Sequence, residues 1–277
     1  MGYDSIAGIK FAVNGFRDRT MQIWMLFYAA VLFASALVTL ALVALLPGLV
    51  AADIIVFGLP VSTLAAAVFA LLYMLGEVFV WSFFHYQFGK NAMRIAGYPM
   101  DGKHNFAQFF LVMLKTLFVN LFSWYDKRVL AAVIVLYVLT ALWIAAGYYV
   151  HPLMVSVGIG FLAFAMLIHY LGVLLHSVRT MFAPLIYLRD GKDGPKAPMK
   201  SFMLVKGQTL DVFIPILIGC VIFGMAALPS YVLAILVVGY PLLALITAGA
   251  VLYFASVFRH FDQKGLSEKQ KAMAQKK

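Results

Sequence analysis

The sequence predicts an all-α, polytopic integral membrane protein with six transmembrane helices arranged as three hairpins, and with amphipathic interfacial helices on the cytoplasmic side. Three observations predict this fold class. Of the 277 residues, 64% are hydrophobic and only 12% are charged, a balance too apolar for a water-soluble domain. Apolar runs long enough to cross a bilayer as a helix, about 20 residues, recur along the chain. Finally, in the resulting topology the Lys and Arg residues all fall on the same side of the membrane.

Short connections separate the expected spans. Those after the first, third and fifth spans read PGLVAADIIVFGLPV, HP and PS, and they contain no Lys or Arg. Because Lys and Arg in short loops stay in the cytoplasm, both termini and the two long loops are expected there, in the plasma (inner) membrane of a prokaryote. The spans form one transmembrane domain, 1–258, followed by a basic cytoplasmic tail, 259–277. They are expected at 23–46, 62–86, 129–150, 153–176, 210–228 and 231–258.

The segment 105–124 is apolar enough to be a seventh span, but its polar residues fall near one helical face. This pattern predicts an amphipathic helix in the cytoplasmic interface, with a re-entrant helix as the alternative. A spanning helix here would invert the downstream topology and place five Arg and Lys residues outside. The polar residues of this segment are Asn105, Gln108, Lys115, Thr116, Asn120 and Ser123.

A recognisable pattern occupies residues 179–213, RTMFAPLIYLRDGKDGPKAPMKSFMLVKGQTLDVF. It combines an Arg-bearing helix end, a P-L-I-Y exit, a small polar turn and an S-F-x-L-x-K-G segment before the next helix; a weaker version occurs at 96–115. The stretch resembles the membrane domain fused to some glycerophosphoryl diester phosphodiesterases, and related stand-alone prokaryotic membrane proteins of unknown function. In the fusions the hydrolase is a soluble barrel, for which this chain has no room. The resemblance therefore implies an accessory or lipid-engaging membrane module.

One carboxylate, Glu77, lies near the middle of an expected span. Tyr73 precedes it, and Trp81 and His85 follow it, at spacings of four, so the four side chains share one helical face. An ionisable group inside the membrane is costly, and such a stripe is typical of a proton relay or a polar substrate path. The structural alternative, which we favour, is that Glu77 bonds His169 or a helix hydroxyl and joins two helices.

The histidines of the fourth span offer a second candidate site. His169 and His176 lie seven residues apart on one face, and a metal or haem site would need His85 as an inward partner. There is no HExxH spacing, and the single cysteine, Cys220, lies inside an apolar run. We therefore interpret these residues as core or interface histidines and predict no metal and no cofactor.

Basic side chains on the cytoplasmic side are candidates to bind anionic lipid headgroups. The glycines of DGKDGPK lack the GxxxxGK[ST] spacing of a phosphate-binding loop, so the 179–207 region is expected to act as an anchor rather than a catalytic loop. The candidates are Arg179, Arg189, Lys192, Lys196, Lys200, Lys206 and, on the interfacial helix, Lys115.

No nucleophile motif or pair of acids on one helical face is found, so no catalytic residue is assigned. The net charge of +10 indicates topology and attraction to anionic lipid, not nucleic acid. The sequence thus predicts a non-enzymatic membrane scaffold or accessory subunit that engages anionic lipid, with a larger membrane protein complex or a homo-oligomer as further partners. The alternative is a small transporter or lipid-handling protein with a polar intramembrane site near Glu77.

Overall fold

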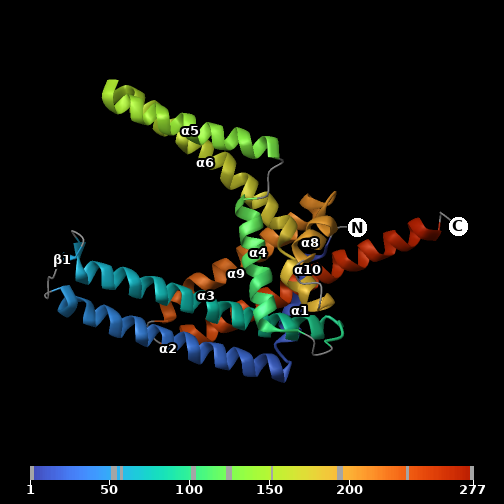
Figure 1. The fold of residues 1–277 in the computed structure, drawn as a ribbon. Helices are drawn as coiled ribbons and strands as arrows, with labels where there is room; N and C mark the ends of the chain where they lie inside the picture. Colours follow the sequence, from blue (N-terminus) through green and yellow to red (C-terminus); the bar gives the residue numbers. More distant parts are fainter. Residues whose placement is uncertain are drawn as a thin grey trace.

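The computed structural model describes residues 3–50, 55–56, 59–100, 104–122, 127–150, 152–191, 196–234 and 237–274. Almost all of them are helical (Figure 1), so the prediction of an all-α chain holds apart from one short antiparallel pair, β1 (Ile55–Val56) and β2 (Leu59–Pro60). The helices are α1 (Ser5–Gly15), α2 (Arg19–Val50), α3 (Val61–Ile95), α4 (Phe106–Phe122), α5 (Lys127–Val150), α6 (Pro152–Thr180), α7 (Ala183–Asp190), α8 (Ala197–Val205), α9 (Thr209–Ala234) and α10 (Gly239–Ala274).

Four helical segments in the described residues are long and apolar enough to cross a membrane, which confirms the prediction of a helical membrane protein. They are Arg19–Ala41, Val155–Asp190, Thr209–Ala234 and Gly239–Gly265. The other two expected spans fall within α3 and α5. The described part of α3 carries Glu77, His85 and Gln87, which make it less apolar, and the apolar part of α5, Val133–Tyr149, is shorter than the other segments. Six spans in three hairpins therefore remain a prediction.

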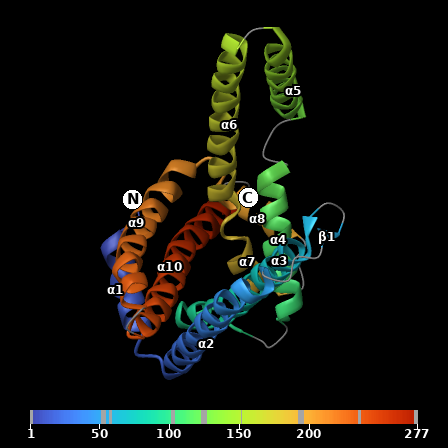
Figure 2. The same cartoon turned by 90° about the vertical axis from the view of Figure 1, so that its left-hand side faces the viewer.

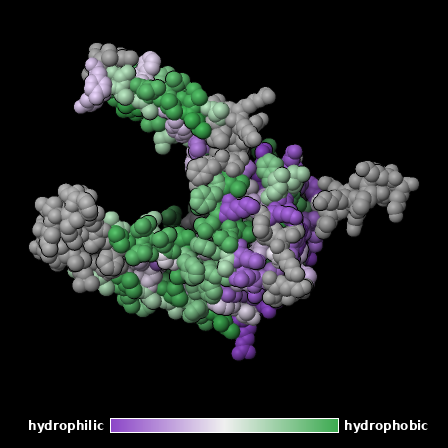
Figure 3. Space-filling view, in the orientation of Figure 1, coloured by the Kyte–Doolittle hydropathy of each residue, from purple (hydrophilic) through white to green (hydrophobic). Residues whose placement is uncertain are grey.

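Helix α10 is the centre of the fold, because α9, α1, α2, α3 and α8 all pack against it. The α5–α6 pair extends away from this centre and from the α2–α3 pair in both ribbon views (Figures 1 and 2). In Figure 3, apolar residues cover much of the α2–α3 and α5–α6 arms, while hydrophilic residues gather on the other side of the view, over the region that Figure 1 labels α8, α10 and α1. The molecule thus has apolar arms and a charged end.

The core lies at the charged end. Its largest fully buried side chains include aromatic residues from α3, α4, α7 and α10, such as Phe88, Phe109, Tyr187 and Phe258. The phenylalanine of α10 stacks on Phe182, which precedes α7, with ring centroids 5.5 Å apart. Close-packed aromatic rings bury large apolar areas and hold the short helices α7 and α8 in fixed positions.

The connection between α9 and α10 lies later than expected. Helix α9 runs through Pro229 and Ser230, the expected turn, and ends at Ala234. A Cβ on Gly239 would lie 2.1 Å from the backbone nitrogen of Ala234, so only glycine fits where α10 begins. Pro241 therefore lies in the first turn of α10, where its missing N–H is not needed, and does not kink the helix interior.

Helix α10 runs through position 258, where the sequence places the boundary between the transmembrane domain and the tail. It continues without a break to Ala274, and Phe261 and Asp262 are buried, whereas Arg259 is exposed. At about 1.5 Å per residue, its 36 residues extend about 54 Å, more than the roughly 30 Å hydrocarbon core requires. Phe261 and Asp262 are therefore part of the folded core.

The polar residues of α4 have two kinds of surroundings. Thr116 and Asn120 are buried, and the Thr180 hydroxyl of α6 donates to the Asn120 side-chain oxygen at 2.6 Å. Gln108 and Lys115 are exposed, as are Leu111 and Phe118 on the apolar side. Part of the polar face therefore packs against protein, and the interfacial position of the helix remains a prediction.

Candidate functional site

Helices α6, α7 and α8 place the 179–213 pattern at the charged end. Helix α6 ends at Thr180 and α7 begins at Ala183. The buried Ser201 of α8 joins this break, because its hydroxyl donates to the Arg179 carbonyl at 2.9 Å and accepts the Phe182 N–H at 3.2 Å. These bonds satisfy backbone groups that a helix end leaves unpaired. Ser201 thus fixes α8 against the α6–α7 break.

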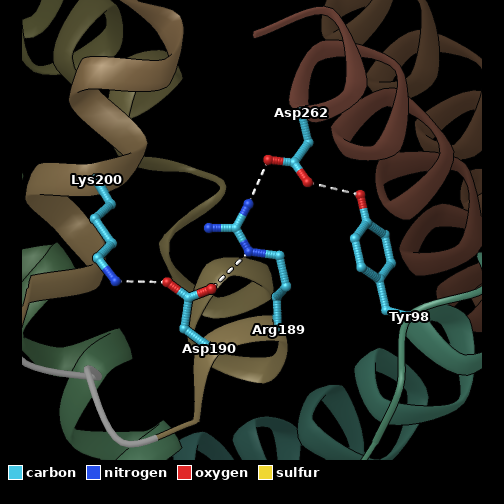
Figure 4. A network of polar contacts seen from close by, with 5 residues as sticks. All are labelled: Tyr98, Arg189, Asp190, Lys200 and Asp262. Atoms are coloured by element: carbon cyan, nitrogen blue, oxygen red, sulfur yellow. Dashed lines mark hydrogen bonds and ion pairs between the residues drawn. The ribbon is translucent and has the colours of Figure 1, made fainter. Parts of the chain in front are cut away.

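A network of ions and hydrogen bonds links α7, α8 and α10 (Figure 4). The Arg189 guanidinium donates to Asp190 at 2.6 Å and also to Asp262 of α10. Lys200 of α8 donates to the other oxygen of Asp190 at 2.6 Å. The side chain of Asp262 is only 6% exposed, so its charge depends on these partners. The network joins the consecutive helices α7 and α8 to α10, whose Asp262 lies 73 residues after Arg189.

Tyr98, in the connection after α3, completes the network. Its hydroxyl donates to the second carboxylate oxygen of Asp262 at 2.9 Å. Burial, and then the neighbouring Asp262 carboxylate, raise the pKa of Tyr98 above its usual value. The phenol therefore stays protonated at neutral pH and keeps donating its hydrogen bond.

The structure divides the candidate headgroup residues into two groups. Three are partly buried: Arg189 and Lys200 are in the network, and Arg179 lies 5.5 Å from the ring centre of Phe202 and donates to Thr209 at 3.3 Å. Lys115, Lys196 and Lys206 are exposed. Lys192 lies outside the described residues. Only the exposed lysines among the described candidates are placed to meet a bilayer surface.

A groove opens beside the network. It has a volume of about 1130 Å³ and lies between α7, α8, the α8–α9 turn and α10. Arg189, Lys200 and Lys206 line it together with the apolar side chains of Met199 and Met203. This is the largest of the described cavities and the point where charged and apolar surfaces meet.

Glu77 lies between α2 and α3, where it accepts a hydrogen bond from Ser35. Tyr73 and Ser35 hydroxyls lie 2.8 Å apart, and Thr39 donates to Tyr73 at 2.8 Å. In one consistent arrangement of donors and acceptors, Thr39 donates to Tyr73, Tyr73 donates to Ser35, and Ser35 donates to the carboxylate. Of the two structural partners considered for Glu77, a helix hydroxyl and His169, the structure places the hydroxyl beside it.

The three candidate histidines do not converge. His85 stacks on Trp81, with ring centroids 3.8 Å apart, and its Nδ1 lies 2.9 Å from the Trp81 carbonyl oxygen. His169 lies on the α5–α6 arm beside Tyr137, and His176 lies beside Phe202 of α8. Within the described residues, no group of three His, Cys, Asp or Glu side chains is arranged to hold a metal ion.

The sequence interpretation missed Asp262, Tyr98, Asp190 and Ser201. Asp262 lies in what reads as a polar tail, and its partners are 73 and 164 residues away in sequence. Ser201 belongs to the S-F-x-L-x-K-G pattern, so its position was noticed without its role.

In comparisons with known proteins, no family model, curated protein or solved structure matches this chain.

Proposed function

We propose that this membrane protein is a non-enzymatic scaffold or accessory subunit whose charged end engages anionic lipid headgroups at the cytoplasmic face of the inner membrane. In this proposal, six spans form three hairpins and both termini are cytoplasmic. The absence of Lys and Arg from the intervening turns supports that orientation. The resemblance of residues 179–213 to lipid-engaging membrane modules favours the same role.

One observation carries the proposal: exposed lysines and exposed apolar side chains occur together at the charged end. Lys196 and Lys206 flank α8, and Met199 and Met203 of that helix are 65% and 58% exposed. A surface with both features suits the boundary between headgroups and acyl chains, where each well-placed cation contributes about 1 kcal/mol with anionic lipid. The internal network holds this surface in place.

Thermal stability in mixed micelles tests the proposal. A lipid that binds the folded protein more tightly than the unfolded chain raises the Tm. We expect phosphatidylglycerol to raise the Tm more than the same amount of phosphatidylcholine, and the difference to shrink at high salt. Replacing Lys115, Lys196 and Lys206 together by Gln is expected to remove most of the difference. Equal Tm values in the two lipids for the unchanged protein would contradict the proposal.

A further inference from the structure

The groove beside the ion network is lined by two chemically different sets of side chains. Ile186, Met199, Met203 and Leu204 are apolar. The polar set includes Tyr98, Gln208 and charged residues of α7, α8, α9 and α10. A soluble ion would use only the polar set, and an apolar molecule only the apolar set. The lining therefore fits an amphiphile.

The charge of the lining favours an anion. Four basic side chains face two carboxylates, so the lining has a net charge of +2. Two of the basic side chains, Arg189 and Lys200, also hold the network together. Lys206 lines the groove and is exposed, and the next residue, Gly207, has a φ of +89°. That backbone conformation, which glycine readily adopts, turns the chain sharply between α8 and α9 beside the groove.

The size and flexibility of the groove favour a lipid. Its volume of about 1130 Å³ lies above the roughly 300–1,000 Å³ of ordinary small-molecule pockets. Met199 and Met203 are one helical turn apart on α8 and point out of the core, since more than half of each is exposed. Methionine side chains are flexible and adapt to apolar ligands of variable shape, such as acyl chains.

We propose that this groove binds one phospholipid with an anionic headgroup. The phosphate lies against Lys206 and Gln208, and an acyl chain lies along Met199, Met203 and Leu204. This inference rests on the proposed engagement of anionic lipid and goes further, because it assigns a single defined site in place of a general surface. The ion network acts as a positioning element, since it fixes α7, α8 and α10 around the groove.

Native mass spectrometry of the full chain in detergent tests the site, with phosphatidylglycerol and phosphatidylcholine titrated separately. We expect the first phosphatidylglycerol to bind more tightly than later ones. Lys206→Gln should weaken that first binding about five-fold, and Met199→Gln with Met203→Gln about ten-fold. Lys10→Gln is the matched control, because Lys10 of α1 is exposed but neither lines the groove nor belongs to the candidate headgroup residues. It should leave the first binding unchanged.

Three outcomes would overturn the inference, and they differ in what they say about the proposed function. Equal weakening by Lys206→Gln and Lys10→Gln would mean general surface binding, so the groove would fail while the proposed function stands. Competition by inorganic phosphate, with no effect of the methionine changes, would identify a site for a free anion. No preference for phosphatidylglycerol in any variant would contradict both proposals. Tm values measured for each variant in detergent alone identify a change that disrupts folding. Met203→Ala, which removes the apolar contact without adding a polar group, then replaces the glutamine change.

Discussion

Replacing Asp262 by Ala tests the role of the ion network in the fold. The change removes the acceptor for both Arg189 and Tyr98 and leaves their donors without that partner. Breaking a buried ion pair costs about 3–5 kcal/mol. Arg189 keeps Asp190 and is 27% exposed, so the lower end of this range applies. We expect Asp262→Ala to lower the free energy of unfolding by about 3 kcal/mol.

The matched control is the ion pair between Arg94 and Asp18, which lies near the surface. Its N–O distance is 2.8 Å, but the side chains are 48% and 29% exposed. An exposed pair of this kind contributes less than about 1 kcal/mol, so Arg94→Gln should have a small effect. Unfolding of both variants in a denaturing detergent, followed by tryptophan fluorescence, measures the two losses. Losses of equal size would refute the argument that burial makes the network important.

Three further predictions concern the apolar arms and the α9–α10 turn. One interhelical hydrogen bond joins the side chains of Ser35 and Glu77. In a double-mutant cycle of unfolding, Ser35→Ala and Glu77→Ala should therefore show a coupling energy of about 0.6–1.7 kcal/mol. Additive effects of the two changes would contradict this. Glu77→Gln keeps an acceptor for Ser35, so its free energy of unfolding should lie within about 1 kcal/mol of that of the unchanged protein. Loss of a transport phenotype at unchanged stability would favour the transporter alternative. Gly239→Ala should destabilise the protein by more than about 1 kcal/mol, because the new methyl group meets backbone atoms of α9, which no side-chain rotation can move. Gly224→Ala is its control, since a methyl group at position 224 enters open space.

Hydropathy and charge patterns predict the helical membrane class and the basic end of this chain, because both depend on local composition. They do not predict how α4 faces its neighbours. A polar helical face looks the same in sequence whether water or protein covers it. Here Thr180 supplies a partner for Asn120 from 60 residues away, and only the packing of α4 against α6 and α7 shows this.

The sequence also did not predict the charged network. Arg189 was assigned to lipid because it follows a helix in a basic segment. Its partner Asp262 comes from the region assigned to a solvated tail. A periodic pattern says which residues share a helical face, whereas the meeting of α7 with α10 depends on aromatic packing around Phe258. The sequence pattern therefore drew attention to the segment that contains Arg189, but it did not predict the pairing of Arg189 with Asp262.

Site-directed labelling of topology tests the central claim most directly. The native Cys220 is replaced by Ala, and one cysteine is placed either at Val238, which is exposed between α9 and α10, or at Lys196, which is exposed at the charged end. A membrane-impermeant maleimide added to intact cells is expected to label the cysteine at 238. It should label the cysteine at 196 only after the cytoplasmic side is opened. Labelling of position 196 in intact cells would place the charged end outside and contradict the proposed engagement of cytoplasmic lipid.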